Sequence, residues 1–261
     1  MTHAQTFGRG NKQALAIHCT LAHSGAWRGV GDALHDQLTL TAFDLPGHGK
    51  SPDWDYKTDL HELCRDAALA YLPGPRDLIG HSFGATVALR LAVEHPDLVR
   101  SLTLIEPVFF AAVIADAPER MAAHDLETAP ITSALVAEDH ARAAQLFNRF
   151  WGDGTKWDAM SAATRRYLTE RMTIVPGQSA MIFEDNAGLM APGKLARAKM
   201  PCLLIEGAMS PDIIDAIHSS LVHRLPNAVR ATIAGAGHMS PLTHPNEVAS
   251  LILRLIEVAE E

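Results

Sequence analysis

The segment 78–89, LIGHSFGATVAL, restricts the possible folds of this chain more than any other stretch. It runs from apolar residues through the turn GHSFG, centred on Ser82, into a series of helix formers. A serine at the tip of a tight strand-to-helix turn adopts a strained backbone conformation, so the residues two positions away on either side must be small. Gly80 and Gly84 satisfy that requirement. The helix N-terminus that follows would direct free N–H groups at a developing oxyanion, so the pattern predicts a nucleophilic serine at position 82.

Short apolar runs alternate with helical patterns on both sides of this turn. We expect strands at 14–18, 38–43, 76–80, 99–105, 201–206 and 229–234, and helices at about 58–71, 83–95, 211–224 and 246–259. The residues before Ala14 leave room for one short edge strand. Such alternation is typical of parallel βαβ units. The expected fold class is therefore α/β, with a mostly parallel central sheet flanked by helices.

The alternation stops between 107 and 199. Stretches such as 139–151 and 161–172 have helical patterns and follow one another without a clear strand. A long insertion of this kind between two strands is often a lid over a site. We therefore expect a core formed by 1–106 and 200–261, and a helical cap formed by 107–199.

Composition excludes several classes of function. The formal net charge of −8 over 261 residues argues against a surface for nucleic acid or an anionic membrane. No apolar run approaches bilayer-spanning length and the first residues lack the apolar stretch of a secretory signal, so we expect a cytoplasmic protein. The three cysteines lack metal-ligand spacing and no glycine-rich phosphate loop is present, so we expect no metal and no cofactor. The expected partner is a small-molecule substrate, and the sequence leaves both a monomer and a homodimer open.

Three further segments carry a resemblance to a known family. They read FDLPGHGKS at 43–51, AGAGHMSPLTHP at 234–245 and IHCTLAHSGAW at 17–27. They resemble, respectively, the loop after the fourth strand, the histidine loop and the oxyanion loop of the α/β-hydrolase fold superfamily, and the helical stretch described above falls where that superfamily inserts a cap domain. The resemblance implies a serine hydrolase with a helical cap. It implies Ser82 as the nucleophile and His238 as the base that activates it.

The resemblance also implies roles for residues around the nucleophile. The oxyanion hole is expected to use the backbone N–H of Phe83 and that of Thr20, in the loop after the first central strand. Cys19 stands where the superfamily usually has glycine, and we expect it to lie so close to the pocket that alkylation of its thiol would inhibit. His81 is expected to point away from Ser82 on the tight turn and either to pack in the core or to line the wall of the pocket. Trp151 is, with Cys19, a candidate for that wall.

The acid of a catalytic triad is not at its usual place. In the superfamily it most often follows the strand expected at 201–206, but the matched position here is Ser210, whose hydroxyl cannot replace an ionised carboxylate. Asp212 is the nearest carboxylate. However, Ser210, Pro211 and Asp212 also form the pattern of a helix start, with serine at the N-cap, proline at N1 and an acid in the first turn.

Glu106, at the end of the strand expected at 99–105, is the alternative acid. The haloalkane dehalogenases within the superfamily place their acid after this earlier strand, and the longer glutamate side chain suits that position. The order Ser82, Glu106, His238 along the chain also matches the order of nucleophile, acid and histidine in this fold. We therefore favour Glu106 over Asp212 as the acid.

Four other polar residues have simpler structural interpretations. Asp44 and His48 are expected to brace their loop, and Glu206 is expected to brace the turn after its strand. His244, just before a proline, is expected to begin the last helix.

A serine nucleophile narrows the possible reactions. Haloalkane dehalogenases and epoxide hydrolases need a carboxylate at this turn, so attack of Ser82 on a carbonyl remains. Hydrolysis of a carboxylic ester is the main expectation, followed by hydrolysis of a thioester or a carbon–carbon bond. A small-molecule receptor or a lyase on the same fold is the alternative, because a fold does not determine function.

Overall fold

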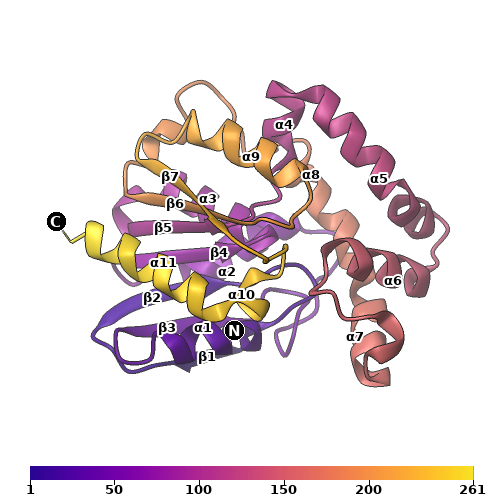
Figure 1. Ribbon diagram of the computed structural model, residues 1–261, viewed down its shortest axis with the longest axis horizontal. Coiled ribbons are helices and arrows are strands. Elements are labelled where there is room, and N and C mark those ends of the chain that lie inside the picture. Colours follow the sequence, from indigo (N-terminus) through magenta and orange to yellow (C-terminus); the bar gives the residue numbers. More distant parts are fainter. Residues whose placement is uncertain (261) are drawn as a thin grey trace.

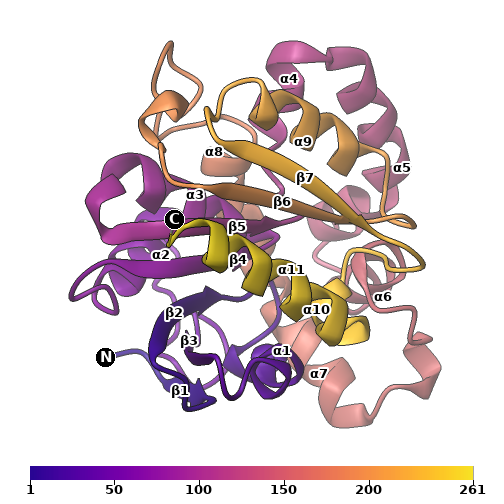
Figure 2. The ribbon, with the colours of Figure 1, turned by 60° about the vertical axis from the view of Figure 1, so that its left-hand side comes forward.

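The computed structural model describes residues 1–260, which contain one seven-stranded sheet in the order β1-β3-β2-β4-β5-β6-β7 (Figures 1 and 2). Within these residues β1 runs antiparallel to β3, and every other neighbouring pair is parallel. The strands are β1 (Ala4–Phe7), β2 (Lys12–Ile17), β3 (Leu38–Phe43), β4 (Arg76–His81), β5 (Val99–Ile105), β6 (Cys202–Gly207) and β7 (Ala228–Ile233). The predicted α/β class with a mostly parallel sheet is confirmed.

Helices cover both faces of the sheet, because the side chains of each strand alternate between two apolar layers. In β2, for example, Leu15 and Ile17 pack on one face, while Ala14 and Ala16 pack on the other. The first face is covered by α2 (Leu60–Leu69), α3 (Phe83–Glu94) and α9 (Ile213–Val222). The second face is covered by α1 (Arg28–Ala33) and α11 (Pro245–Val258).

A helical insertion joins β5 to β6, and we use this name for residues 107–199. Its helices α5, α6 and α7 lie together beside one end of the sheet (Figure 1, right). The helices of the whole insertion are α4 (Phe110–Asp116), α5 (Pro118–Val136), α6 (His140–Trp151), α7 (Ala162–Arg171) and α8 (Ser179–Ile182). No helix within residues 1–260 combines the length and apolar content that crossing a bilayer requires.

The expected strands and long helices are present, and their ends lie within two residues of the expected ones. Two short helices, α1 and α10 (Ser240–Thr243), were not expected. Helix α1 contains two glycines within six residues and α10 is a single turn, so neither carries an extended apolar period. Gly31 is needed in α1 because a Cβ there would lie 2.4 Å from the Cβ of Phe7.

Candidate active site

Ser82 occupies the sharp turn between β4 and α3. Its backbone has φ of 56° and ψ of −119°, a strained conformation for a residue with a side chain. A Cβ on Gly80 would lie 2.5 Å from the Cα of Ala85, and one on Gly84 would lie 2.4 Å from the carbonyl oxygen of His18. Only glycine fits at these two positions, so the turn depends on both.

A chain of hydrogen bonds joins Ser82 to a histidine and a carboxylate. The Nε2 of His238 lies 3.0 Å from the Oγ of Ser82, and its Nδ1 lies 2.6 Å from the Oε2 of Glu106. All three residues are buried, and Glu106 is completely so. The structure thus brings together three residues that are 24 or more positions apart in sequence, in the geometry by which a carboxylate orients a histidine toward a nucleophile.

Glu106 follows β5 directly and has φ of 46°, in the left-handed region. Its Oε1 accepts a hydrogen bond of 2.7 Å from the N–H of Gly207 and one of 2.5 Å from the hydroxyl of Ser210. Burial alone would raise the pKa of this carboxyl group, but the hydrogen bonds from His238, Ser210 and Gly207 hold it below its ordinary value. Glu106 is therefore ionised near neutral pH although it is buried.

The helix start expected at Ser210 and Pro211, in the turn after β6, is wrong. Ser210 does not cap a helix, because its hydroxyl donates to Glu106, and Pro211 is not the first helical residue, because α9 begins at Ile213. Asp212 is the N-cap residue and makes no capping bond through its side chain. A hydrogen bond to a buried ionised carboxylate is stronger than a neutral capping bond, which explains why the serine turns inward.

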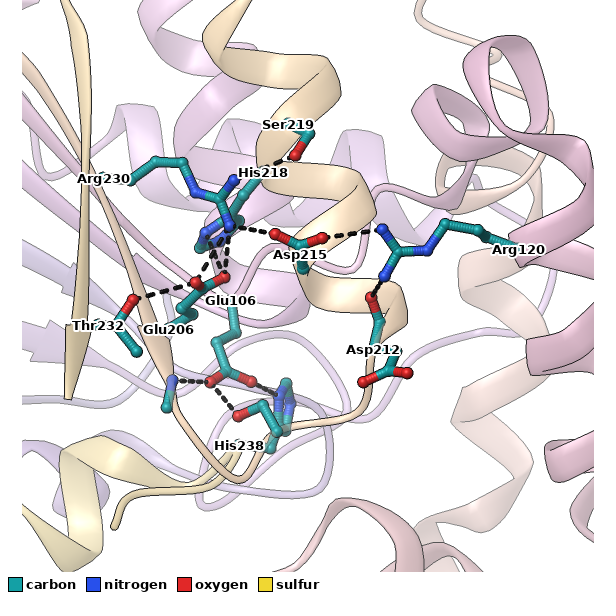
Figure 3. A network of polar contacts seen from close by, with 12 residues as sticks. Glu106, Arg120, Glu206, Asp212, Asp215, His218, Ser219, Arg230, Thr232 and His238 are labelled. Atoms are coloured by element: carbon teal, nitrogen blue, oxygen red, sulfur yellow. Dashed lines mark hydrogen bonds and ion pairs between the residues drawn. The ribbon is translucent and has the colours of Figure 1, made fainter. Parts of the chain in front are cut away.

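Asp212 itself does not approach His238. Its side chain is exposed, and Figure 3 shows no contact to its carboxylate. The backbone carbonyl of Asp212 accepts a hydrogen bond of 2.5 Å from Arg120 of α5, whose guanidinium also binds Asp215 at 2.8 Å. The structure therefore places Glu106, and not Asp212, beside the histidine.

His81 packs against the loop that carries His238. It does not line the cavity at Ser82; its Nε2 donates to the backbone carbonyl of His238 at 2.8 Å, and the two rings lie 5.1 Å apart. Burial lowers the pKa of His81 to about 3, so it is neutral. Of the two roles left open for His81, the pocket wall does not apply, and its hydrogen bond holds the loop that carries His238.

A cavity of about 570 Å³ opens beside Ser82 and His238. The sheet side of its wall includes Cys19 and Thr20, and the helical insertion provides Trp151 and most of the rest. The further lining residues are Val108, Phe110, His124, Thr128, Ile131, Thr132, Leu135, Val136, Phe147, Val175, Pro176, Gln178, Ser179, Ile182, Phe183 and Met239. Its size is that of a small-molecule site. Residues 1–260 contain no group of three or more His, Cys, Asp or Glu side chains that could hold a metal ion.

Of the expected oxyanion residues, Phe83 follows Ser82 in the chain and Thr20 lines the same cavity as Ser82. Phe83 is the first residue of α3, where a backbone N–H has no partner within the helix. Thr20 lines the cavity, and its hydroxyl donates to the Oε1 of Gln178 at 2.9 Å. Gln178 belongs to the insertion and was not expected from the sequence, because a contact over 158 positions leaves no local pattern. Burial raises the pKa of the Cys19 thiol to about 12, which leaves this pocket residue un-ionised and slow to alkylate.

Loop residues outside the catalytic geometry brace their surroundings. Asp44 accepts hydrogen bonds from the N–H groups of Ser24 and Lys50, at 2.6 and 2.7 Å. The Nδ1 of His48 donates to the carbonyl of Pro46 at 3.0 Å. These contacts hold the segment after β3 against the loop after β2.

Two further polar residues lie where a structural role was expected. His244 is the N-cap residue of α11. Glu206 forms an ion pair of 2.9 Å with Arg230 (Figure 3) and does not line the cavity at Ser82.

The chain belongs to the alpha/beta hydrolase family, whose model matches residues 14–251. A pimeloyl-[acyl-carrier protein] methyl ester esterase from Nitrosomonas europaea is 30% identical over 259 residues, which cover 95% of this chain and 96% of that protein. A pimeloyl-[acyl-carrier protein] methyl ester esterase from Xanthomonas campestris pv. campestris is 28% identical, over 97% of this chain and 98% of that protein. Among solved structures, Cfl2 from Burkholderia cenocepacia has the same fold, with a TM-score of 0.73 at 23% identity over 98% of this chain and 92% of that chain. The predicted superfamily is thus confirmed, and so is the predicted class, a hydrolase of the esterase type.

Proposed function

We propose that the protein hydrolyses carboxylic esters through an acyl-enzyme on Ser82, with His238 as general base and Glu106 as the acid of the triad. The observation that carries the proposal is the chain of short contacts from Ser82 through His238 to Glu106, at the wall of an apolar cavity. The full-length likeness to esterases supports the choice of an ester.

In the first half of the reaction, the Nε2 of His238 accepts the proton of the Ser82 hydroxyl as the Oγ attacks the ester carbonyl. The carbonyl oxygen becomes an oxyanion, which the N–H groups of Phe83 and Thr20 would stabilise. The protonated histidine then donates to the departing alkoxide, and the alcohol leaves. In the second half, His238 removes a proton from water as the water oxygen attacks the acyl carbon. The bond between that carbon and the Oγ of Ser82 then breaks, His238 returns the proton to the Oγ, and the carboxylic acid leaves.

Glu106 stabilises the imidazolium that forms in both halves. Its Oε2 keeps the proton of His238 on Nδ1, so that Nε2 is free to accept the serine proton. Its Oε1 is held by Ser210 and Gly207. These two donors keep the carboxylate ionised and fix its position although it is completely buried.

The scissile group is proposed to be a simple alkyl ester. The esterases similar to this chain are named for a methyl ester of an acyl chain, and the cavity wall offers apolar surface for such a chain. Thioester or carbon–carbon bond hydrolysis would use the same acyl-enzyme chemistry. The rates of thioester and carbon–carbon bond hydrolysis are therefore compared with the rate of ester hydrolysis in the experiment described next.

Labelling with a fluorophosphonate tests the nucleophile. The wild-type protein is expected to be labelled and to hydrolyse short methyl and 4-nitrophenyl esters, whereas Ser82→Ala should lose both. Ser250→Ala is the matched control, because Ser250 is exposed on α11 and is not among the residues that line the cavity. A wild-type protein that binds esters without labelling or turnover would support a small-molecule receptor instead. Faster turnover of thioesters or of carbon–carbon substrates than of esters would move the assignment to those reactions.

A further inference from the structure

The loop after β2 contains a strained turn at residues 19–22, which we call the Thr20 turn. The N–H of Ala22 donates to the carbonyl of Cys19 at 3.2 Å and so closes this turn. Leu21 is its third residue and has φ of 61°, in the left-handed region, where a turn normally has glycine or asparagine. A bulky side chain is unfavourable in that region, so such a residue persists only where the surrounding structure holds it.

Leu21 packs inside the helical insertion and not in the core of the sheet. Its side chain is buried, with 7% of its surface exposed. It belongs to an apolar cluster that is distinct from the layers on the two faces of the sheet. Among the described residues, the other buried members of this cluster all come from the insertion: Ile131, Ala134, Ala143, Ala144, Leu146 and Met172. The insertion therefore holds the side chain of the strained residue.

Hydrogen bonds from the insertion hold the residues on either side of Leu21. Before it, the hydroxyl of Thr20 donates to the Oε1 of Gln178 at 2.9 Å, and Gln178 is buried. After it, the carbonyl of Ala22 accepts a hydrogen bond of 3.0 Å from the hydroxyl of Tyr167. Three consecutive residues of the Thr20 turn are thus in contact with the insertion.

Tyr167 of α7 joins two loops of the core through its hydroxyl group. Besides donating to Ala22, its oxygen accepts a hydrogen bond of 3.0 Å from the N–H of Gly49, in the loop after β3. The guanidinium of Arg171, one helical turn further on, lies 3.9 Å from the centroid of the Tyr167 ring. This cation–π contact and the two hydrogen bonds fix the position from which the phenol holds the turn.

We propose that Tyr167 and Gln178 are positioning residues for the oxyanion hole, because they hold the turn that presents the N–H of Thr20. The inference rests on the proposed function, which gives this N–H its role. A donor stabilises a developing oxyanion most effectively when its position is fixed before the reaction. The insertion thus contributes to the rate of the reaction as well as to the wall of the cavity.

Tyr167→Phe tests the inference by removing one hydroxyl group. We expect kcat for methyl octanoate to fall about tenfold, the effect of one hydrogen bond, and KM to stay within about twofold, because the loss concerns the transition state. Tyr56→Phe is the matched control and should have the wild-type kcat. The hydroxyl of Tyr56 also contacts the insertion, 2.9 Å from that of Thr173, but Tyr56 belongs neither to the Thr20 turn nor to the cavity wall.

Thr20→Val and Gln178→Met test the second contact. The first variant keeps the backbone N–H and removes the hydroxyl, and the second removes its acceptor with little change in size. Each should lower kcat about three- to tenfold, and the double variant should be no slower than the slower single one, because both changes break the same bond. Thr20→Ser keeps the hydroxyl and should stay within about twofold of the wild-type kcat. Losses that multiply in the double variant would mean that the two residues act independently, against the inference.

A pair of ketones separates an effect on the oxyanion from an effect on binding. The Oγ of Ser82 adds to the carbonyl carbon of trifluoromethyl hexyl ketone, its proton passes to His238, and the carbonyl oxygen becomes an oxyanion. The Ki of this ketone should rise about tenfold in Tyr167→Phe, in parallel with the fall in kcat. The Ki of methyl hexyl ketone, which binds without forming an oxyanion, should stay at the wild-type value. Equal rises for both ketones, or a kcat of Tyr167→Phe equal to that of wild type, would overturn the inference.

Amide hydrogen exchange in the Ser82→Ala protein separates the inference from the proposed function, because it needs no turnover. Peptides that contain residues 17–27 should exchange faster when Tyr167→Phe is added than when Tyr56→Phe is added. If they do so while the wild-type protein is not labelled and hydrolyses no ester, the proposed function fails and the hold of the insertion on the turn stands. If the wild-type protein hydrolyses esters, and Tyr167→Phe changes neither kcat nor exchange, the inference fails and the proposed function stands.

Discussion

Strands β5 and β6 are neighbours in the sheet, but the carboxylates at their carboxyl ends differ in burial. After β5, the single carboxylate of Glu106 is completely buried and all its contacts are with His238, Gly207 and Ser210. At the end of β6 and in the turn and helix that follow, the carboxylates of Glu206, Asp212 and Asp215 are partly or fully accessible (Figure 3). The carboxylate beside His238 thus comes from the strand end that offers one carboxylate, although three carboxylates lie near the other.

Two of the carboxylates near the end of β6, those of Glu206 and Asp215, are paired with arginines and not with His238. Arg230 of β7 contacts both Glu206, at 2.9 Å, and Asp215, at 2.7 Å, and Arg120 of the helical insertion contacts Asp215 at 2.8 Å. His218 and Arg230 beside Glu206 hold its pKa below the ordinary value. These carboxylates tie α9 to β7 and to the insertion. The turn contributes to the active site through neutral donors, the Ser210 hydroxyl and the Gly207 N–H.

The largest effect should come from removing the charge at β5. Glu106→Gln preserves the size of the side chain but not its charge, so it can no longer stabilise the imidazolium or fix the tautomer of His238. We expect kcat for a methyl ester to fall about 10³–10⁴-fold, as when a triad carboxylate is made an amide. Stopped-flow or steady-state kinetics measure it, and circular dichroism checks that the variant is folded. A loss of less than tenfold would mean that Glu106 is not the acid.

Moving the carboxylate to the β6 turn tests whether the two strand ends are interchangeable. Glu106→Ala together with Ser210→Asp should recover at least about tenfold of the kcat lost in Glu106→Ala, because position 210 lies within hydrogen-bond distance of the carboxylate that it would replace. Glu106→Ala with Ser210→Asn is the uncharged control and should recover nothing. Equal rates for the two double variants would show that the turn cannot present an acid to His238.

The contribution of the serine can be measured separately. Ser210→Ala removes a hydrogen bond to an ionised group, worth about 1.5 kcal/mol, so kcat should fall about tenfold while KM stays close to the wild-type value. The loss of this donor also raises the pKa of Glu106, and the acidic limb of the kcat/KM profile should move to higher pH. Ser210→Thr keeps the hydroxyl and should restore both measurements. An alanine variant with unchanged kcat and an unchanged pH profile would leave Ser210 without a role in the reaction.

The dependence of thermal stability on pH should also report the hydrogen bonds to Glu106. The pKa of Glu106 in the folded protein is below its ordinary value of 4.5, so the unfolded chain binds the proton more readily. The stabilisation is complete above that value and is lost as the pH falls through the lowered pKa. The Tm of the wild-type protein should therefore fall more steeply between pH 5 and pH 3 than that of Glu106→Gln. Parallel curves would mean that this carboxylate does not stabilise the fold.

The sequence was sufficient for the strands, the long helices and the turn at Ser82, since each has a local pattern of period, glycine or cap. It was not sufficient for the direction of Ser210, whose helix-start pattern is local while its hydrogen bond to Glu106 spans 104 positions. The hydrogen bond from His81 to the loop of His238 and the cavity positions of His124 and Gln178 were not predicted for the same reason. Such contacts depend on how the insertion and the last loops pack against the sheet, which no local pattern encodes.

The smallest effect should come from Asp212, the carboxylate closest in sequence to the usual acid position. Its side chain is exposed, and the structural contact at this residue is made by its backbone carbonyl with Arg120. Asp212→Asn leaves that carbonyl in place, so kcat and KM should stay within about twofold of wild type, as expected for a surface substitution. Arg120→Ala is the useful companion, because it removes the carbonyl contact without touching a carboxylate. If Asp212→Asn instead lowered kcat as much as Glu106→Gln, the acid would belong to β6 and the contrast between the two strand ends would be reversed.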